Sequence, residues 1–253
     1  MFALLKKPLR ARSKPLETVK RTLEVGNRAL PLTIKENSRA TRITLRIEPG
    51  GRALNLTVPA GLRKSEIEEF LERHQGWLLT KLSKFSTDNP IRSGGFVPIR
   101  GVQHRIDHTG TLRGLTEIAV VDGVPVVRVS GLEDHLGRRV ATFLKKEARR
   151  DMELLAFRHA ASIRKPVASV TLKDTRSRWG SCSWDGNLSF SWRIVMAPPL
   201  VIDYLAAHEV AHLKEMNHGP KFWALCHQLC PRMEEARKWL KQNGSQLHAL
   251  DFS

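Results

Sequence analysis

Short stretches near the start of the chain alternate apolar and polar residues, which is the pattern of half-buried β-strands. Four such stretches lie between residues 18 and 60 and are separated by turn residues. In the third stretch, apolar residues at 43, 45 and 47 alternate with polar residues that include Arg42 and Arg46. This part of the sequence therefore predicts a small β-meander with one apolar and one basic face.

Helical spacing replaces this alternation after residue 60. Ser65, followed by Glu68 three residues later, predicts a capping box, and apolar residues then recur every three or four positions to about Ser83. Further strand-like segments follow between residues 96 and 130. The stretch 133–163 contains one glycine and no proline, and its apolar residues keep helical spacing, which predicts one long helix.

The second half of the chain reads as strands followed by helices. One strand is predicted at 167–174 and another at 187–195, where apolar and polar residues alternate strictly and Ser189 and Ser191 fall on the polar face. A turn-rich loop separates the two strands. Pro199 stands at the first-turn position of the helix that follows.

This order of elements predicts an α+β fold with two regions. We expect a basic, β-rich N-terminal region at residues 1–130 and a second domain at residues 131–253 that includes the long connecting helix. The chain has 253 residues and is 41% hydrophobic, which is enough for one large or two small globular domains with real cores.

The composition is typical of a protein from a reducing compartment. The chain has three cysteines, no run of eighteen apolar residues, and an N-terminal apolar run too short for a secretory signal. We therefore expect a soluble cytoplasmic protein with no membrane partner.

Positive charge is concentrated in the first part of the chain. The formal net charge is +17, and residues 1–150 carry 29 basic and 15 acidic side chains, a balance of +14. Residues 151–253 carry 13 and 10, a balance of +3. Such a field attracts polyanions, so a nucleic acid, a nucleotide or an acidic protein is a candidate partner of the basic half. A solvated basic surface without a partner is the alternative.

The helix predicted after Pro199 contains the pentad HEVAH at 208–212, an HExxH pattern. Residues four apart project from one helix face about 6 Å apart along the axis, so His208 and His212 can bind a single ion. Zinc suits such ligands. Glu209 is rotated to the side of this site, where it can deprotonate a water without binding the metal itself.

A catalytic zinc site needs a third protein ligand and an open position. His218 is the strongest candidate, because the sequence NHGP that contains it can end one helix, turn, and start the next. Glu215, Glu234 and Glu235 are the alternatives. The spacing of the histidines matches the long zincin motif, except that Glu215 stands where metzincins have glycine.

Longer blocks accompany the pentad. They are RWGSCSWDGNLSFSWRIVMAPP at 178–199, VIDYLAAHEVAHLKEMNHGPKFW at 201–223, the closing helix with Arg237, Trp239 and Leu240, and more loosely RITLRIEPGGRALNLTVPAG at 42–61. Together they resemble the YgjP-like metallopeptidase domain family, related to the SprT-like and WLM proteases, over most of the chain. The resemblance implies a zincin-like catalytic domain with an HExxH active-site helix. It also implies one zinc ion held by His208, His212 and His218, with Glu209 as catalytic acid and base.

Four residues are candidates for substrate contact: Arg178, Trp179, Ser189 and Ser191. The first two lie in the loop before the strand at 187–195, where the tryptophan could line a cleft or equally cap the core. The two serines lie on the polar edge of that strand, which could pair with an extended peptide backbone. Candidate donors to an oxyanion are Arg176, Arg178 and His227.

These features favour a zinc-dependent metallopeptidase acting on a protein or peptide, with Glu209 passing a proton from water to the leaving amine. One alternative is a metal-dependent hydrolase of a nucleotide phosphoanhydride, which the absence of a P-loop sequence disfavours. The other is a nucleic-acid-binding module with a structural metal. It is disfavoured because a structural site would fill the fourth position with Cys or His, leaving Glu209 without a role.

Overall fold

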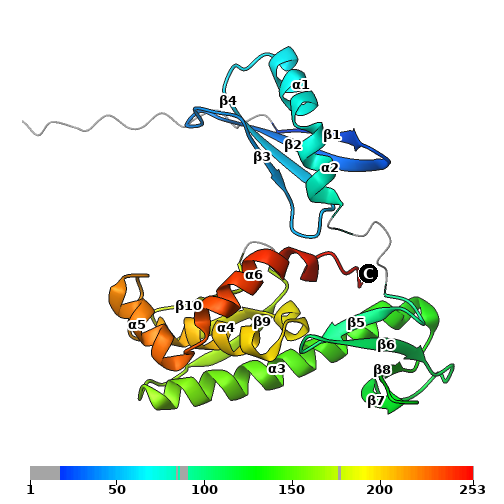
Figure 1. Cartoon of the computed structure of the whole chain (residues 1–253), viewed down its shortest axis with the longest axis vertical. Coiled ribbons are helices and arrows are strands. Elements are labelled where there is room, and N and C mark those ends of the chain that lie inside the picture. The colour runs from blue at the N-terminus through cyan, green and yellow to red at the C-terminus, as the bar shows by residue number, and fades with distance from the viewer. Residues whose placement is uncertain (1–17, 84, 86–90, 176–177, 253) are drawn as a thin grey trace, which may run out of the picture. The chain divides into compact units, whose positions relative to one another are not determined.

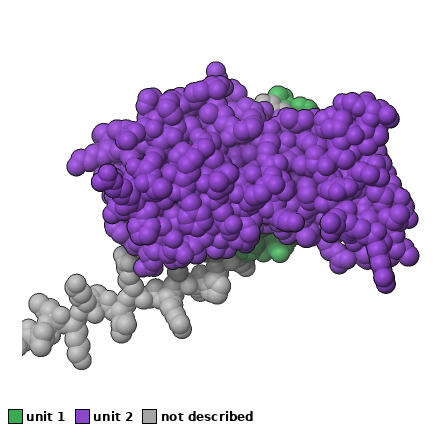
Figure 2. Space-filling model, turned by 90° about the horizontal axis from the view of Figure 1, so that it is seen from below, with its two compact units in different colours: residues 1–83 green, residues 84–253 purple. Residues whose placement is uncertain are grey.

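The computed structural model describes residues 18–83, 85, 91–175 and 178–252 of the chain. The chain forms two compact units, residues 1–83 and residues 84–253 (Figures 1 and 2). This division differs from the boundary at 130/131 that the sequence suggested. The reason is that Val97, Ile106 and Val127, which come from strands before residue 130, are buried in the same core as the helices that follow.

The first unit is a four-stranded sheet with two helices. Its elements are β1 (Thr18–Val25), β2 (Arg28–Asn37), β3 (Thr44–Ile47), β4 (Leu54–Pro59), α1 (Lys64–Arg73) and α2 (Gln75–Leu82). The strand order is β1-β2-β4-β3, with β2 and β4 parallel and the other pairs antiparallel. The sheet is therefore not the simple meander that the sequence suggested. Strand β4 carries the fully buried Leu54 and Leu56 and takes an inner position, whereas the half-exposed β3 takes the edge.

The helical segment after this sheet is divided at His74, which ends α1 and precedes α2. The cap lies two residues earlier than the sequence suggested, where the main-chain N–H of Arg63 donates to the Glu66 carboxylate at 3.1 Å. Glu68 instead forms an ion pair with Arg21 of β1 at 2.6 Å. The first helix is thus tied to the sheet through a side chain that the sequence pattern assigned to its cap.

The second unit begins with another four-stranded sheet. Its strands are β5 (Phe96–Ile99), β6 (Val102–His108), β7 (Glu117–Val121) and β8 (Val124–Val129), in the order β5-β6-β8-β7. A 3₁₀ turn, η1 (Glu133–His135), leads into α3 (Leu136–Ser162), the long helix expected from the sequence. Its buried residues, among them Val140, Leu144 and Ala148, recur at helical spacing and face the core.

A three-stranded sheet and three helices complete this unit. They are β9 (Ser169–Lys173), β10 (Gly180–Cys182), β11 (Asn187–Ser191), η2 (Trp192–Met196), α4 (Pro199–Ala211), α5 (Pro220–Leu229) and α6 (Met233–Leu247). The strand order is β10-β11-β9, so β11 is the middle strand. In Figure 1, α3 runs the length of the unit, with the sheet β5–β8 at one end and α5 towards the other. None of the helices in the described ranges has the length and apolar character to span a membrane. The architecture is a mixed α+β fold, as the order of elements predicted.

The last predicted strand ends early, at Ser191. The next five residues form η2, in which every side chain is buried. Arg193 is held there by Asp174 at 2.7 Å and by the main-chain carbonyls of Leu247 and Leu250, both at 3.1 Å. Arg193 continues the alternation of the sequence past the end of the strand. Its side chain forms hydrogen bonds inside the protein, however, and does not face solvent.

Candidate metal centre

Helix α4 carries His208 in its last turn, and His212 caps its C-terminal end. The helix starts with Pro199 at a first-turn position, and most of its side chains are buried. The imidazole centroids of His208 and His212 lie 5.1 Å apart. The two rings therefore project from the same side of the helix end, as a spacing of four residues requires.

The chain turns back after α4 and brings His218 to these two rings. The N–H of Gly219 donates to the Asn217 carbonyl at 2.7 Å, and Gly219 caps α5, which starts at Pro220. The turn is therefore short and closed by the backbone itself. It places His218 one residue before the cap of the next helix.

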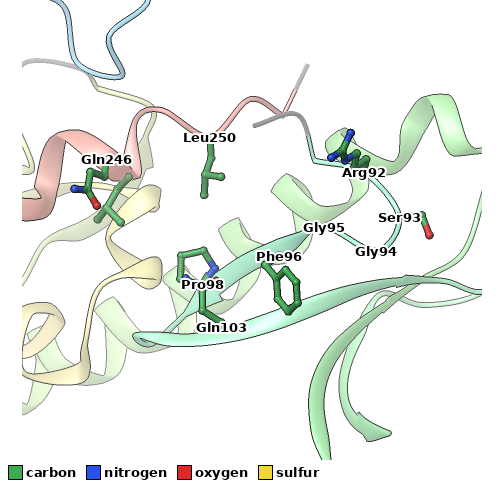
Figure 3. A pocket seen from close by; sticks show the side chains of 10 residues that line it. Arg92, Ser93, Gly94, Gly95, Phe96, Pro98, Gln103, Gln246 and Leu250 are labelled. Atoms are coloured by element: carbon green, nitrogen blue, oxygen red, sulfur yellow. The ribbon is translucent and has the colours of Figure 1, made fainter. Parts of the chain in front are cut away.

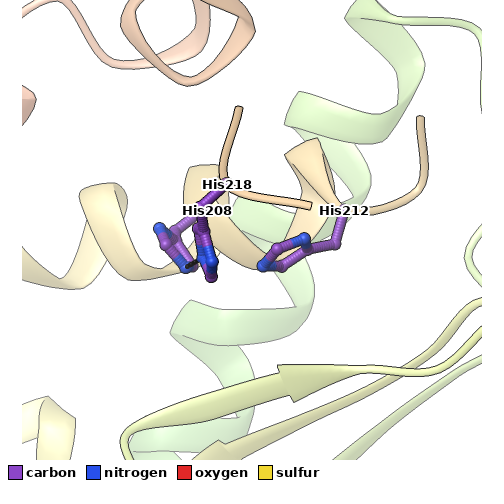
Figure 4. Close-up of side chains that lie close together, drawn as sticks. All are labelled: His208, His212 and His218. Carbon is purple, nitrogen blue, oxygen red and sulfur yellow. Dashed lines mark hydrogen bonds between the residues drawn. The ribbon is translucent and has the colours of Figure 1, made fainter. Parts of the chain in front are cut away.

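The three histidines form a cluster (Figure 4). The centroid of the His218 ring lies 5.0 Å from that of His208 and 4.7 Å from that of His212. One ring nitrogen from each residue lies within 4.8 Å of the others, and the Nε2 atoms of His208 and His218 are 3.1 Å apart. Three nitrogen donors at these separations can be bridged by a single ion.

Hydrogen bonds on the outer side of the rings orient two of the three imidazoles. The Nδ1–H of His212 donates to the main-chain carbonyl of Glu215 at 3.1 Å. The hydroxyl of Tyr204 lies 3.3 Å from Nδ1 of His208. Both contacts engage Nδ1 and leave Nε2 for another partner, as is usual for metal-binding histidines.

Aromatic residues of α5 cover the cluster on one side. The ring centroid of Phe222 lies 4.5 to 4.9 Å from those of all three imidazoles. Trp223 stacks on His218 with the centroids 5.5 Å apart. The turn that returns His218 to the centre thus also brings the apolar wall that excludes water from one side of it.

Burial and the neighbouring rings keep the imidazoles of His208 and His212 neutral. Burial, with His212 and His218 close by, lowers the pKa of His208 to about 3. Burial likewise lowers the pKa of His212. Because a neutral imidazole has a lone pair available, these rings are in the form that binds a metal ion at neutral pH.

Glu209 is buried beside the cluster, with 4% of its surface exposed. Burial raises the pKa of its carboxyl group to about 8, and the positive charge of Arg178 partly opposes that rise. Gly180 of β10 lies directly against this side chain, because a β-carbon at position 180 would lie 2.7 Å from Cγ and Cδ of Glu209. The sequence reasoning missed this role of Gly180. A glycine inside a strand is the signal that could have pointed to it, since such glycines mark close approach of another group.

The alternative third ligands are engaged elsewhere. Glu234 and Glu235 form ion pairs with neighbouring arginines, both at 2.7 Å. Glu215 contacts the centre through its main-chain carbonyl. Among the residues that the structure describes, His218 is the third donor that the fold brings to the two helix histidines.

The expected substrate contacts at Ser189 and Ser191 need correction. Both serines lie on β11, and this strand pairs with β10 on one side and β9 on the other. Ser191 is fully buried, and its N–H donates to the carbonyl of Trp179 at 2.7 Å. No sheet edge is therefore open at these serines, and the edge strand on this side is β10.

The other expected contact residues lie closer to the centre. Arg178 is exposed, and its charge acts on Glu209. Trp179 is half-buried and packs against His248 with the ring centroids 4.7 Å apart. Of the remaining oxyanion candidates, His227 lies in the last turn of α5, and Arg176 lies outside the described residues.

The three cysteines are thiols that stay protonated at neutral pH. Burial raises the pKa of Cys182 and Cys230 to about 11 and that of Cys226 to about 12. None of them belongs to a metal-ligand cluster within the described ranges. They therefore act as packing residues, with Cys226 and Cys230 buried and Cys182 half-buried.

A wider cavity lies elsewhere in the second unit, between β5 and the end of α6 (Figure 3). Its volume is about 1040 Å³, and Phe96 and Leu250 line it. Of the described residues that line this cavity, Arg92 alone is charged, and no histidine of the cluster is among them. We therefore place the candidate functional site at the histidine cluster and not at this cavity.

No curated protein and no solved structure matches the chain. The family model of the YgjP-like metallopeptidase domain matches residues 41–243, which is most of the chain and includes the histidine cluster and Glu209. The resemblance inferred from the sequence blocks is thereby confirmed. A metallopeptidase family implies a metal-dependent hydrolase, and the three clustered histidines are the groups that a metal would need. The chain belongs to the YgjP-like metallopeptidase family.

Proposed function

We propose that the protein is a zinc-dependent peptidase in which Glu209 is the general base. The observation that carries this proposal is the convergence of three imidazoles beside one buried carboxylate. The donor nitrogens of His208, His212 and His218 lie within 4.8 Å of one another, and Glu209 comes from the same helical turn as His208. Family membership supports hydrolysis of a peptide bond over other reactions.

The donor set fits zinc in a catalytic site. Three imidazole nitrogens leave a fourth position for water or substrate, whereas structural zinc sites usually fill all four positions with Cys or His. No cysteine joins the three histidines in the part of the chain that the structure describes. When bound by His208, His212 and His218, zinc supplies Lewis acidity towards the scissile carbonyl and a water of lowered pKa.

Glu209 moves the proton in this proposal. Its carboxylate accepts a proton from the attacking water and then donates it to the nitrogen of the leaving amine. Burial raises the pKa of Glu209, so in its ionised form this carboxylate is a stronger proton acceptor than that of an exposed glutamate. Arg178 lies near enough for its charge to act on Glu209, so it is the candidate that we favour for stabilising negative charge on the substrate oxygen.

Strand β10 offers the substrate a backbone to pair with. It is an edge strand, it packs against α4, and its first residue, Gly180, lies against Glu209. Edge strands carry unpaired main-chain N–H and C=O groups, to which an extended peptide can add as a further strand. A peptide bound there would pass alongside the carboxylate and the histidine cluster.

Cleavage of a defined peptide mixture by the zinc-loaded full chain, with products identified by mass spectrometry, tests this function. Glu209→Gln prepared in parallel separates the activity of the protein from that of a contaminating protease. A third arm offers ATP, which tests the phosphoanhydride alternative. Cleavage of peptides by the wild type and its loss in Glu209→Gln would support the proposal. Equal cleavage by both proteins, or hydrolysis of ATP with all peptides intact, would contradict it.

A further inference from the structure

A second cavity, of about 600 Å³, lies between α6 and the start of β10. The residues that line it are Trp179, Tyr204, Glu234, Arg237, Lys238, Leu240 and Lys241. We call it the α6 pocket, because five of these residues come from that helix. Two aromatic side chains and the apolar Leu240 give it a surface on which a side chain can pack, and the remaining lining is charged.

The α6 pocket adjoins the candidate metal centre through two separate contacts. Tyr204 lines the pocket, and its hydroxyl lies 3.3 Å from Nδ1 of His208 in the cluster. Trp179 immediately precedes Gly180, which lies against Glu209. One residue, Tyr204, therefore separates the pocket from a proposed ligand, and the segment Trp179–Gly180 links it to the proposed base.

Positive charge dominates the α6 pocket. Its lining has three cationic side chains and one carboxylate, and that carboxylate, Glu234, is already paired with Arg237 at 2.7 Å. Neither Lys238 nor Lys241 forms an ion pair with any carboxylate in the described part of the chain. Two ammonium groups thus remain to bind an anion.

Arg237 is held against the aromatic wall of the metal centre. Its guanidinium lies over the ring of Trp223, with Cζ 4.3 Å from the ring centroid. Trp223 in turn stacks on His218, with the ring centroids 5.5 Å apart. One indole ring therefore separates this cation of the pocket from the histidine cluster.

Strand β10 connects this pocket with a smaller one. The smaller cavity, of about 250 Å³, is lined by His212 and by Ser183 and Trp184, which follow the strand. A peptide extended along β10 would therefore run from one cavity to the other and pass Glu209 between them. This arrangement places one side chain of the substrate in the α6 pocket, on one side of the bond that is cleaved.

We propose that the α6 pocket binds a carboxylate group of the substrate and so sets the specificity of the proposed peptidase. The carboxylate is either an Asp or Glu side chain near the scissile bond or the free C-terminus of the peptide. This inference rests on the proposed function for the reaction, but it concerns binding and has a readout of its own. Lys238 and Lys241 supply the attraction, and the paired Arg237 fixes one wall.

The test uses matched peptides and the full zinc-loaded chain. One set is amidated at the C-terminus and carries Glu or Gln at each of the three positions on either side of the cleavage site. The second set has neutral side chains. Each of its peptides ends at one of those positions, in either a free carboxyl group or an amide. The first set reports an acidic side chain, and the second reports a C-terminal carboxylate. At one position we expect the carboxylate peptide to have a kcat/KM about fivefold or more above that of its neutral partner, mainly through KM.

Charge reversal in the pocket should abolish this preference. Lys238→Glu and Lys241→Glu change exposed side chains, so both variants are expected to fold, and each should lower the ratio of carboxylate to neutral peptide to about one. Lys146→Glu, an exposed residue of α3 outside the pocket, is the matched control and should keep the ratio of the wild type. Peptide cleavage without any preference for a carboxylate, or a preference that survives both reversals, would overturn the pocket assignment.

Binding separates failure of the pocket from failure of the proposed function. Fluorescence anisotropy with Glu209→Gln measures the Kd of the same labelled peptides without turnover. A tighter Kd for the carboxylate peptide, lost in the Glu209→Gln, Lys238→Glu double variant, would support the pocket even if the wild type cleaves none of the peptides. Equal Kd values for both members of every pair would reject the pocket, whatever the outcome of the cleavage assay.

Discussion

Gly180 of β10 and Glu209 of α4 are in direct contact, with no room between them for a β-carbon. A methyl group at position 180 would lie 2.7 Å from Cγ and Cδ of the glutamate, closer than real β-carbon contacts. The backbone of the edge strand is therefore the wall against which the proposed general base is positioned. Any side chain at this position must move either the strand or the carboxylate.

Gly180→Ala should impair catalysis without removing the metal. The three atoms nearest to the added methyl all belong to Glu209, so the methyl displaces this carboxylate, and a misplacement of about 1 Å can lower a rate about 100-fold. We expect a fall of that order in kcat/KM, with zinc content unchanged by metal analysis. Gly76→Ala in α2 is the matched control, because a β-carbon there meets nothing within 4 Å. Activity of Gly180→Ala equal to that of this control would show that the contact does not position the base.

His212→Ala should lose the metal. The wild type is expected to bind one zinc ion per chain, and removal of one of three nitrogen donors leaves too few ligands to hold it. Metal analysis after gel filtration measures the stoichiometry directly. His135→Ala, which removes an exposed imidazole from η1, should keep one ion. A His212→Ala protein that still carries zinc one-to-one would remove this residue from the ligand set.

Glu209→Gln should keep the metal and lose the reaction. The amide has nearly the same shape as the carboxyl group but cannot accept the proton from water, and general-base catalysis is typically worth a factor of about 10² to 10⁴. We expect peptide hydrolysis to fall within that range while zinc stays at one ion per chain. Glu117→Gln on β7 makes the same change at an exposed site and should be silent. Undiminished turnover in Glu209→Gln would mean that another group is the base.

Asp203 should make the free energy of unfolding depend on pH in the acid range. Burial alone would raise the pKa of this carboxyl group, but the hydrogen bond from His159 at 2.9 Å and the charges of His159 and Arg158 outweigh it and hold the pKa below its usual range. The charged form is therefore favoured in the folded state. Its contribution is fully present above the ordinary Asp pKa of about 4 and is lost as the pH falls through the lower value of the folded protein.

Chemical unfolding at several pH values measures this contribution. Asp203→Asn should lower the free energy of unfolding at pH 7 by about 1 to 3 kcal/mol, because a partly buried charged hydrogen bond is lost. The difference from the wild type should shrink at acid pH. Asp134→Asn, at an exposed position of η1, should show neither effect. A deficit that is the same at pH 7 and at pH 3 would contradict the assigned role of the charge.

If the basic face of the first unit binds polyanions, removal of its arginines should lower the affinity. Arg42 and Arg46 are exposed at the edge strand β3 and the segment before it. If both contact phosphates, their replacement by Ser should lower the affinity for DNA or RNA and reduce the slope of log K against log salt by about 2. Arg113→Ser with Lys146→Ser removes equal charge from the second unit and is the control. The absence of any binding to nucleic acid at low salt would refute the recruitment of polyanions by this face.

Local patterns predicted the parts of the fold that depend on one segment. The long helix α3 follows from a stretch without proline whose apolar residues keep helical spacing, and the start of α4 follows from Pro199. The pairing of His208 with His212 follows from helix geometry alone. These features need no knowledge of what packs against the segment.

Features that depend on distant segments could not be read from the pattern. The inner position of β4 depends on which strands pair with one another in the sheet. Alternation within a single strand does not determine that pairing. The buried Arg193 looks polar and solvent-facing in the sequence because its partners are distant along the chain, 19 residues away for Asp174 and 54 and 57 residues away for the two carbonyls. The contact of Gly180 with Glu209 joins a strand to a helix, so no spacing rule within either element predicts it.

The contact between Tyr204 and His208 gives the candidate centre a single position for a spectroscopic label. Tyr204 is the only tyrosine in the sequence, and its hydroxyl lies 3.3 Å from Nδ1 of His208. Incorporation of fluorotyrosine during expression would therefore place a single fluorine nucleus beside the metal centre without changing any other residue. One ¹⁹F resonance would then report the occupancy of the histidine cluster while the reaction is in progress.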